Sequence, residues 1–253
     1  MHLLAAPRHE LYSGQLVPKR TADRLRRLVE RTKAGEPVQY LTRSAPFLDF
    51  DVYVDHRVLI PRPETEELVA RTLARLKPEA KSQKPKAKTR AVDYGTGSGC
   101  IAIALARALP DARILAVDAS KTALAVAARN LDRYDLASRV RLAQARSLDE
   151  RVLTRLRGRL DLLISNPPYV PTPRLARLDR AVRREPRLAL DGGPKGANIV
   201  AMLLTQGLSL LRPGGLLAVE IDGAHEAIVR KLAPDAGIEC DLAGRIRYAF
   251  LTR

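Results

Sequence analysis

From Ala91 onward, short apolar runs alternate with segments whose apolar residues recur at helical spacing. The pattern predicts strands at 91–93, 113–118, 140–142, 160–165 and 216–221, helices at 98–109, 119–131 and 198–211, and a turn at 212–215. Such alternation is typical of parallel strands joined by helical crossovers. The sequence therefore predicts an α/β fold with a doubly wound, mostly parallel sheet. The run 248–252 predicts a last, antiparallel strand at the edge of this sheet.

The chain before this alternation is organised differently. Its apolar spacing predicts a helix over 21–34, a β-hairpin within 44–58 and a second helix over 64–76. Thr21 is expected to cap the first helix and Gly35 to end it. Residues 77–90 are rich in Lys, Pro and Ala without apolar periodicity, which is typical of a solvated linker. We therefore expect three regions: a short N-terminal helical segment 1–45, a hairpin, helix and Lys/Pro-rich linker 46–90, and a sheet domain 91–253.

Composition limits the compartment and the partners. No apolar run in the 253 residues approaches the length of a membrane-spanning helix. Cys100, Cys240 and the four histidines show no spacing typical of a disulfide framework or a metal site. We therefore expect reduced thiols, no metal and a cytoplasmic location. The net charge of +16 favours acidic or nucleic-acid-bearing partners and is compatible with proximity to RNA or the ribosome. Arginine on solvated surfaces is the alternative explanation.

A glycine-rich stretch follows the first expected strand: Asp93-Tyr94-Gly95-Thr96-Gly97-Ser98-Gly99. Such glycines let the backbone turn tightly and let a ligand approach closely, although a tight strand-to-helix turn explains the glycines alone equally well. Asp118 ends the second strand, where a carboxylate in such folds binds ribose hydroxyls. The spacing G-x-G-x-G differs from that of dinucleotide sites, and Asp93 suits an ammonium group better than a phosphate. S-adenosyl-L-methionine has a ribose and an ammonium group without phosphate, so it fits better than NAD.

The stretch Asn166-Pro167-Pro168-Tyr169 directly follows the strand expected at 160–165. The two prolines lack backbone donors, so this stretch offers acceptors. A planar NH2 group is expected to donate one proton to the Asn166 side chain and one to the Pro167 carbonyl while it stacks on Tyr169. The stretch therefore predicts a binding site for an amide or an exocyclic amine. A Pro-Pro turn that closes a strand is the alternative.

Together these motifs resemble the N5-glutamine methyltransferases that modify peptide chain release factors, a family of class I S-adenosylmethionine-dependent methyltransferases. The similarity extends from about residue 22 to the end of the chain. Besides the two motifs above it includes 35–41, Phe47, 58–66, 185–193 and 241–245. The resemblance implies a Rossmann-like methyltransferase sheet preceded by a small, reduced N-terminal helical segment and a hairpin.

The resemblance also implies an activity: transfer of a methyl group from S-adenosyl-L-methionine to the glutamine amide in the Gly-Gly-Gln loop of a class I peptide chain release factor. The implied partner is this release factor, and we expect a monomeric enzyme. The expected catalytic residues are Asn166, Pro167, Pro168 and Tyr169. The expected cofactor-binding residues are Asp93, Gly95, Thr96, Gly97, Ser98, Gly99, Asp118, Arg146, Ser147 and Asn166.

Three features depart from the family pattern. In Val219-Glu220-Ile221-Asp222-Gly223 an Asp stands where the family commonly has a Gly. The family commonly has an Asp beside the adenine after the third strand, whereas this chain has Arg146 and Ser147 there. The family also usually carries a larger N-terminal helical domain than 1–45. Three other functions remain open at this point. Arg146 and the short N-terminal segment are compatible with a non-catalytic, ribosome-associated protein of this fold. A ribosomal-protein glutamine methyltransferase has similar motifs, and a nucleic-acid amine methyltransferase of the adenine N6 type binds flipped bases with the same stretch. This last alternative is supported by a run of arginines after the stretch: Arg174, Arg177, Arg180, Arg183, Arg184 and Arg187.

Overall fold

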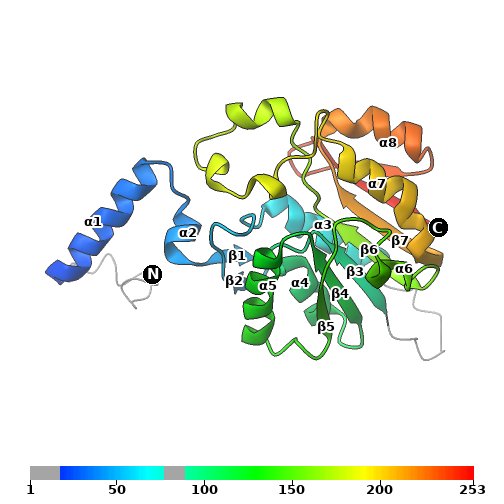
Figure 1. The fold of residues 1–253 in the computed structure, drawn as a ribbon, viewed down its shortest axis with the longest axis horizontal. Coiled ribbons are helices and arrows are strands. Elements are labelled where there is room, and N and C mark those ends of the chain that lie inside the picture. Colours follow the sequence, from blue (N-terminus) through cyan, green and yellow to red (C-terminus); the bar gives the residue numbers. More distant parts are fainter. Residues whose placement is uncertain (1–17, 77–88) are drawn as a thin grey trace.

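The computed structural model describes residues 18–76 and 89–253. At its centre lies a seven-stranded sheet in the order β5-β4-β3-β6-β7-β9-β8 (Figure 1). Its strands are β3 (Arg90–Tyr94), β4 (Arg113–Asp118), β5 (Val140–Gln144), β6 (Leu160–Ser165), β7 (Leu211–Glu220), β8 (Gly237–Cys240) and β9 (Ile246–Thr252). The strands β3 to β7 pair in parallel, and β9 pairs antiparallel with both neighbours. The predicted doubly wound, mostly parallel sheet with an antiparallel last strand is confirmed.

Helices cover both faces of this sheet. One face packs against α3 (Pro63–Leu76), α4 (Cys100–Ala108) and α5 (Lys121–Arg133), and the other against α6 (Arg151–Thr154), α7 (Asn198–Gln206) and α8 (Glu226–Leu232). Burial on two faces explains why the central strands read as almost continuous apolar runs. In β6, for example, Leu162, Leu163 and Ile164 are all fully buried. The polar ends of the strands are therefore the part of the sheet available for chemistry.

The segment before the sheet contains the predicted hairpin. Strands β1 (Ala45–Phe47) and β2 (Phe50–Val52) pair antiparallel. The ring of Phe50 contacts Tyr134 at the end of α5 edge to face, with centroids 5.5 Å apart. Hairpin residues and α3 thus share one apolar cluster with the sheet. The predicted division into 1–45, 46–90 and 91–253 stays a prediction, and most of the predicted linker 77–90 lies outside the described residues.

The first helix differs in one detail from its prediction. Helix α1 (Lys19–Lys33) begins before Thr21, and Pro18 rather than Thr21 is its N-cap. The predicted cap is wrong because helical hydrogen bonding already starts at the Pro18 carbonyl, which accepts the N–H groups of Thr21 at 2.8 Å and Ala22 at 3.0 Å. Gly35, with φ of +85°, ends the helical region as expected. Helix α1 buries no residue and projects away from the sheet, and the short α2 (Val38–Thr42) connects it to the hairpin (Figure 1).

Three predictions near the carboxyl end of the chain are corrected. Strand β9 is not at the edge, because the short β8 pairs with its outer side; β8 contains too little apolar pattern to be recognised in the sequence. The expected turn at 212–215 is a bulge within β7, since Leu211 pairs with Leu160 and Leu216 with Leu162. The helix expected to reach 211 ends at Gln206, and a 3₁₀ turn follows it.

Candidate active site

A cavity of about 550 Å³ lies at the carboxyl ends of β3, β4 and β6. Open α/β sheets bind ligands at this edge, because the loops that leave parallel strands meet there. The cavity brings together seven of the residues predicted for the site: Gly95, Gly97, Asp118, Arg146, Asn166, Pro167 and Pro168. Apolar walls are added by Val58 and Leu59 before α3 and by Ala189 after β6.

The glycine loop forms the floor between β3 and β4. The backbone N–H groups of Gly95 and Thr96 both donate to the Val117 carbonyl, at 2.9 Å each. Gly95 and Gly97 have φ of +78° and +55°, which favours residues without a Cβ. The N–H of Gly97 donates to Oδ2 of Asp118 at 2.9 Å. The loop is thereby tied to β4 along its whole turn, and its backbone faces the cavity.

Asp118 lies at the end of β4 with its carboxylate at the cavity. Its Oδ1 accepts the backbone N–H of Ser120 at 2.8 Å, and its Oδ2 accepts that of Gly97. Burial raises the pKa of Asp118, while these backbone donors lower it. These two bonds hold the side chain in place. Each carboxylate oxygen can accept more than one hydrogen bond, so Asp118 still has acceptor capacity toward the cavity.

Four of the predicted cofactor residues in and before the glycine loop do not line the cavity: Asp93, Thr96, Ser98 and Gly99. Asp93 is fully buried, and its Oδ2 accepts the Thr96 hydroxyl at 2.6 Å and the Ala102 N–H at 3.1 Å. Its Oδ1 is buried without a hydrogen-bond partner among the described residues. Asp93 therefore supports the loop from below, and its predicted contact with an ammonium group stays a prediction.

Burial raises the pKa of Asp93 to about 7, which makes stability depend on pH. The unfolded carboxyl titrates near 4, so the free energy of unfolding falls as pH rises from about 4 through 7. The variant Asp93→Asn lacks this loss, because its amide stays neutral. In denaturant titrations of the ligand-free protein, we expect the variant to gain roughly 2–4 kcal/mol relative to wild type between pH 5 and pH 8.5. Parallel stability curves for the two proteins would contradict this assignment.

Asn166 and Pro167 lie where two cavities meet. Both residues line the cavity described above and also a smaller one of about 260 Å³ on the other side. Pro168 faces only the larger cavity and Tyr169 only the smaller one. The end of β6 is fixed because the Ser165 hydroxyl donates to the Tyr94 carbonyl at 2.7 Å. The four predicted catalytic residues thus form the wall between a nucleoside-sized cavity and a second opening.

The loop at 191–196 supports this wall from behind. A Cβ on Gly192 would lie 2.7 Å from the Pro168 carbonyl oxygen, and one on Gly196 would lie 2.3 Å from that of Tyr169. The chain at Val170 also pairs with Asp191 as an isolated bridge. The backbone of the four residues therefore packs directly on glycine. This close packing explains Gly192 of the 185–193 motif, whereas a Cβ on the next residue, Gly193, would overlap the Asn198 side chain.

Sequence reasoning missed several polar residues beside this wall. The amide Nδ2 of Asn166 donates to the Thr65 hydroxyl, and that hydroxyl donates to Oε2 of Glu220, both at 2.8 Å. The Tyr169 hydroxyl donates to Oε1 of Glu220 at 3.2 Å. Glu220 is fully buried, and burial raises its pKa to about 7. The sequence does contain a signal for Glu220: it is a carboxylate within the apolar strand predicted at 216–221, and a buried carboxylate requires polar partners.

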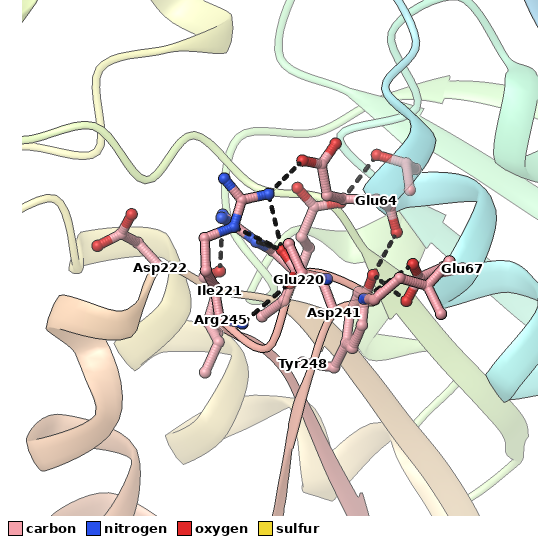
Figure 2. A network of polar contacts seen from close by, with 12 residues as sticks. Glu64, Glu67, Glu220, Ile221, Asp222, Asp241, Arg245 and Tyr248 are labelled. Atoms are coloured by element: carbon pink, nitrogen blue, oxygen red, sulfur yellow. Dashed lines mark hydrogen bonds and ion pairs between the residues drawn. The ribbon is translucent and has the colours of Figure 1, made fainter.

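The surroundings of Glu220 join α3 to the carboxyl end of the chain. Figure 2 shows Glu220 together with Glu64 of α3, Tyr248 of β9, and Asp241 and Arg245 of the turn that joins β8 to β9. The Tyr248 hydroxyl lies 2.9 Å from the Glu64 carbonyl oxygen and 3.1 Å from Oε2 of Glu67, the two acceptors within reach of its one proton. Arg247 lies beside Tyr169, with its guanidinium carbon 5.9 Å from the ring centre. These contacts hold the start of α3 against β9.

Glu185 makes a second link missed by sequence reasoning. Its buried carboxylate accepts the backbone N–H of Ile60 at 3.0 Å and pairs with Arg62. Burial raises the pKa of Glu185, and the Arg62 guanidinium opposes this change. The Pro-rich segment before α3 and the segment after β6 are thereby joined across the two cavities.

The remaining residues singled out in the sequence are Arg146, Ser147 and the arginines after residue 169. Arg146 is exposed and lines the larger cavity, and the Tyr94 hydroxyl donates to its carbonyl at 2.8 Å. Ser147 does not line it. The arginines that follow the stretch do not form one helix face. They are exposed on short 3₁₀ turns at Thr172–Arg177, Val182–Arg184 and Arg187–Ala189 and in the chain between them.

Within the described ranges 18–76 and 89–253, no group of three His, Cys, Asp or Glu residues is arranged to hold a metal ion. No helix within them has both the length and the apolar character needed to cross a bilayer.

Comparison with known proteins gives consistent results. The model of the family "Methyltransferase small domain" matches residues 76–178. A release factor glutamine methyltransferase of Moorella thermoacetica is 45% identical over 89% of this chain and 78% of its own length. A protein of the same description from Chlorobaculum tepidum is 41% identical over 91% of this chain and 79% of its own length.

A solved structure supports the fold. A methyltransferase from Pyrococcus furiosus superposes with a TM-score of 0.57 at 16% identity, covering 90% of this chain and 98% of the other. At this level of identity the likeness concerns the fold alone.

Proposed function

Since this chain belongs to the family of release factor glutamine methyltransferases, we propose that it methylates the side-chain amide nitrogen, N5, of a glutamine in a class I peptide chain release factor. We propose S-adenosyl-L-methionine as the methyl donor. The observation that carries the proposal is the position of Asn166 and Pro167 between two cavities. One cavity suits the donor, and the other suits the substrate side chain.

The larger cavity fits this donor. Gly95 and Gly97 present backbone without a Cβ, and Asp118 has acceptor capacity for ribose hydroxyls. Asp93 has a buried carboxylate oxygen with no hydrogen-bond partner among the described residues, an acceptor that suits a nearby ammonium group. When bound, the donor supplies a methyl carbon whose bond to positively charged sulfur breaks, with the electron pair kept by sulfur, while the glutamine nitrogen gains the methyl group and releases one proton.

Asn166 and Pro167 supply the two acceptors that this nitrogen needs. An amide nitrogen is a weak nucleophile because its lone pair is delocalised into the carbonyl. If its two protons are held by Oδ1 of Asn166 and by the Pro167 carbonyl, the lone pair is directed away from them. Acceptors fixed in this way also stabilise the positive charge that develops on the nitrogen. The ring of Tyr169 limits the width of the substrate opening.

A labelling experiment tests the proposal. The protein is incubated with methyl-labelled S-adenosylmethionine and, separately, with a class I release factor, ribosomal proteins and nucleic acid. We expect label on the release factor, and none when the glutamine of its Gly-Gly-Gln loop is replaced by glutamate, which has no amide protons to hold. Label on ribosomal protein or nucleic acid alone would overturn the release-factor assignment. We propose that the enzyme acts in the cytoplasm as a monomer.

A further inference from the structure

Asn166 carries an amide whose two ends have opposite hydrogen-bonding character. Its Oδ1 is an acceptor and its Nδ2 a donor, so a rotation by half a turn exchanges them with little change in shape. A substrate NH2 group needs the acceptor. If the donor faced it instead, two sets of amide protons would meet. The orientation of this side chain therefore matters as much as its presence.

The contacts of Asn166 fix one orientation. Its Nδ2 lies 2.8 Å from the Thr65 hydroxyl oxygen, and the same hydroxyl lies 2.8 Å from Oε2 of Glu220. An ionised carboxylate only accepts, so the Thr65 hydroxyl donates its one proton to Glu220. The hydroxyl is then left with lone pairs toward Asn166, which accept from Nδ2. Oδ1, which has no hydrogen-bond partner among the described residues, lies at the other end of the amide.

We propose that Thr65 and Glu220 are positioning residues that hold the Asn166 side chain with its oxygen toward the substrate amide. The assignment rests on the proposed function, because it presupposes an NH2 group as the acceptor of the methyl. Thr65 and Glu220 act only through Asn166 and Tyr169. They are far apart in sequence from Asn166, on α3 and at the end of β7.

The groups that face Glu220 determine how the contacts respond to pH. From α3 these are the Thr65 hydroxyl and the charge of Glu64; after β6 it is the Tyr169 hydroxyl; from β9 it is the guanidinium of Arg247. Burial raises the pKa of Glu220, whereas the hydroxyl donors and Arg247 lower it. A protonated Glu220 donates instead of accepting, so the direction of the Thr65 hydroxyl is no longer fixed. Mild acid should therefore lower kcat.

Substitutions on one helix test the assignment. In Thr65→Val the hydroxyl is lost at nearly constant shape, and we expect kcat to fall by about 10- to 100-fold, the effect of one buried hydrogen bond left unmade. The KM for S-adenosylmethionine should stay within about twofold, and Thr65→Ser should restore most of kcat. Thr72→Val is the matched control, because this buried hydroxyl contacts only the Leu68 carbonyl on the same helix. Its kcat should equal that of wild type.

The pH profile gives a second readout. Gln in place of Glu220 still accepts from Thr65 through its oxygen, and its charge does not change with pH. In Glu220→Gln we therefore expect the fall of kcat between about pH 8 and pH 6 to be lost, while Thr65→Ser retains it. An unchanged acid limb in Glu220→Gln would count against the assignment.

A third measurement needs no methyl transfer. In wild type the side-chain NH2 of Asn166 should exchange with water at least about tenfold more slowly than in Thr65→Val, as measured by NMR on the labelled side chain. Wild-type protein that fails to modify any release factor would overturn the proposed function while this exchange rate still tests the orientation. Equal exchange rates, or equal kcat in Thr65→Val and Thr72→Val, would overturn the positioning role.

Discussion

Replacement of Asn166 by Ala is expected to lower kcat for release-factor methylation by about 10²- to 10⁴-fold, because it removes the acceptor placed where charge develops on the nitrogen. The affinity for S-adenosylmethionine should stay within a few-fold of wild type, since the glycine loop and Asp118 remain intact. Single-turnover rates with saturating release factor, together with calorimetric binding of the methyl donor, separate the two quantities.

A second amide deletion provides the control for this variant. Gln206 is exposed at the end of α7 and lines neither cavity, so Gln206→Ala should have wild-type kcat. A loss of less than tenfold in Asn166→Ala would show that the amide is not gripped by this side chain. Equal losses in kcat and in donor affinity would show that Asn166 serves the cofactor cavity alone.

Replacement of Gly196 by Ala is expected to lower the free energy of unfolding by about 2–4 kcal/mol and kcat by at least about tenfold. The added Cβ would lie 2.3 Å from the Tyr169 carbonyl oxygen, and φ at this position is +73°. Positive φ alone costs about 1 kcal/mol in a residue with a Cβ, and relief of the overlap costs about 1–3 kcal/mol more. The backbone at Tyr169 must move to relieve it, and Asn166 and Pro167 move with it.

The chain offers a matched control for this prediction. Gly244 has nearly the same φ, +76°, but no atom lies within 4 Å of a Cβ added there. Gly244→Ala should therefore lose only about 1 kcal/mol of stability, with unchanged kcat. Denaturant unfolding at constant slope measures both variants. Equal losses of stability and of kcat in the two variants would show that the packing of the 191–196 loop on residues 166–169 is not important for the site.

Much of the fold was predictable because local patterns of apolar residues indicate its strands and helices. Strands β4 and β6 have the predicted bounds, since an apolar run buried on both faces of a parallel sheet has an unambiguous start and end. Strand β8 and the bulge in β7 were not predictable in this way. Strand β8 carries too little apolar pattern to be recognised, and the bulge lies in the pairing of β7 with β6, a contact across the fold that leaves no periodic mark in the sequence.

The residues of the candidate site likewise divide into those that local sequence predicts and those that only the fold brings together. Asn166, Gly95 and Asp118 were identifiable because spacing within a short segment expresses their chemistry. Thr65 was not, because an alcohol at the start of a helix is ordinary, and Glu220, although it is an acid in an apolar strand, gives no sign in its own segment of which residues it contacts. Only the docking of α3 against the end of β7 brings them within hydrogen-bond distance of each other and of Asn166.

The order of strands in the sheet has a consequence for how the chain folds. Strand β9 lies between β7 and β8, although β8 precedes it in the chain. Local pairs form before distant ones because they close shorter loops, so β8 and β9 should first pair as a hairpin and then dock as a unit. Docking brings β9 against β7 and Tyr248 against Glu64 together. The start of α3, which carries Thr65, is thus held by this docked unit, and chains in which β8 and β9 have not docked should be inactive.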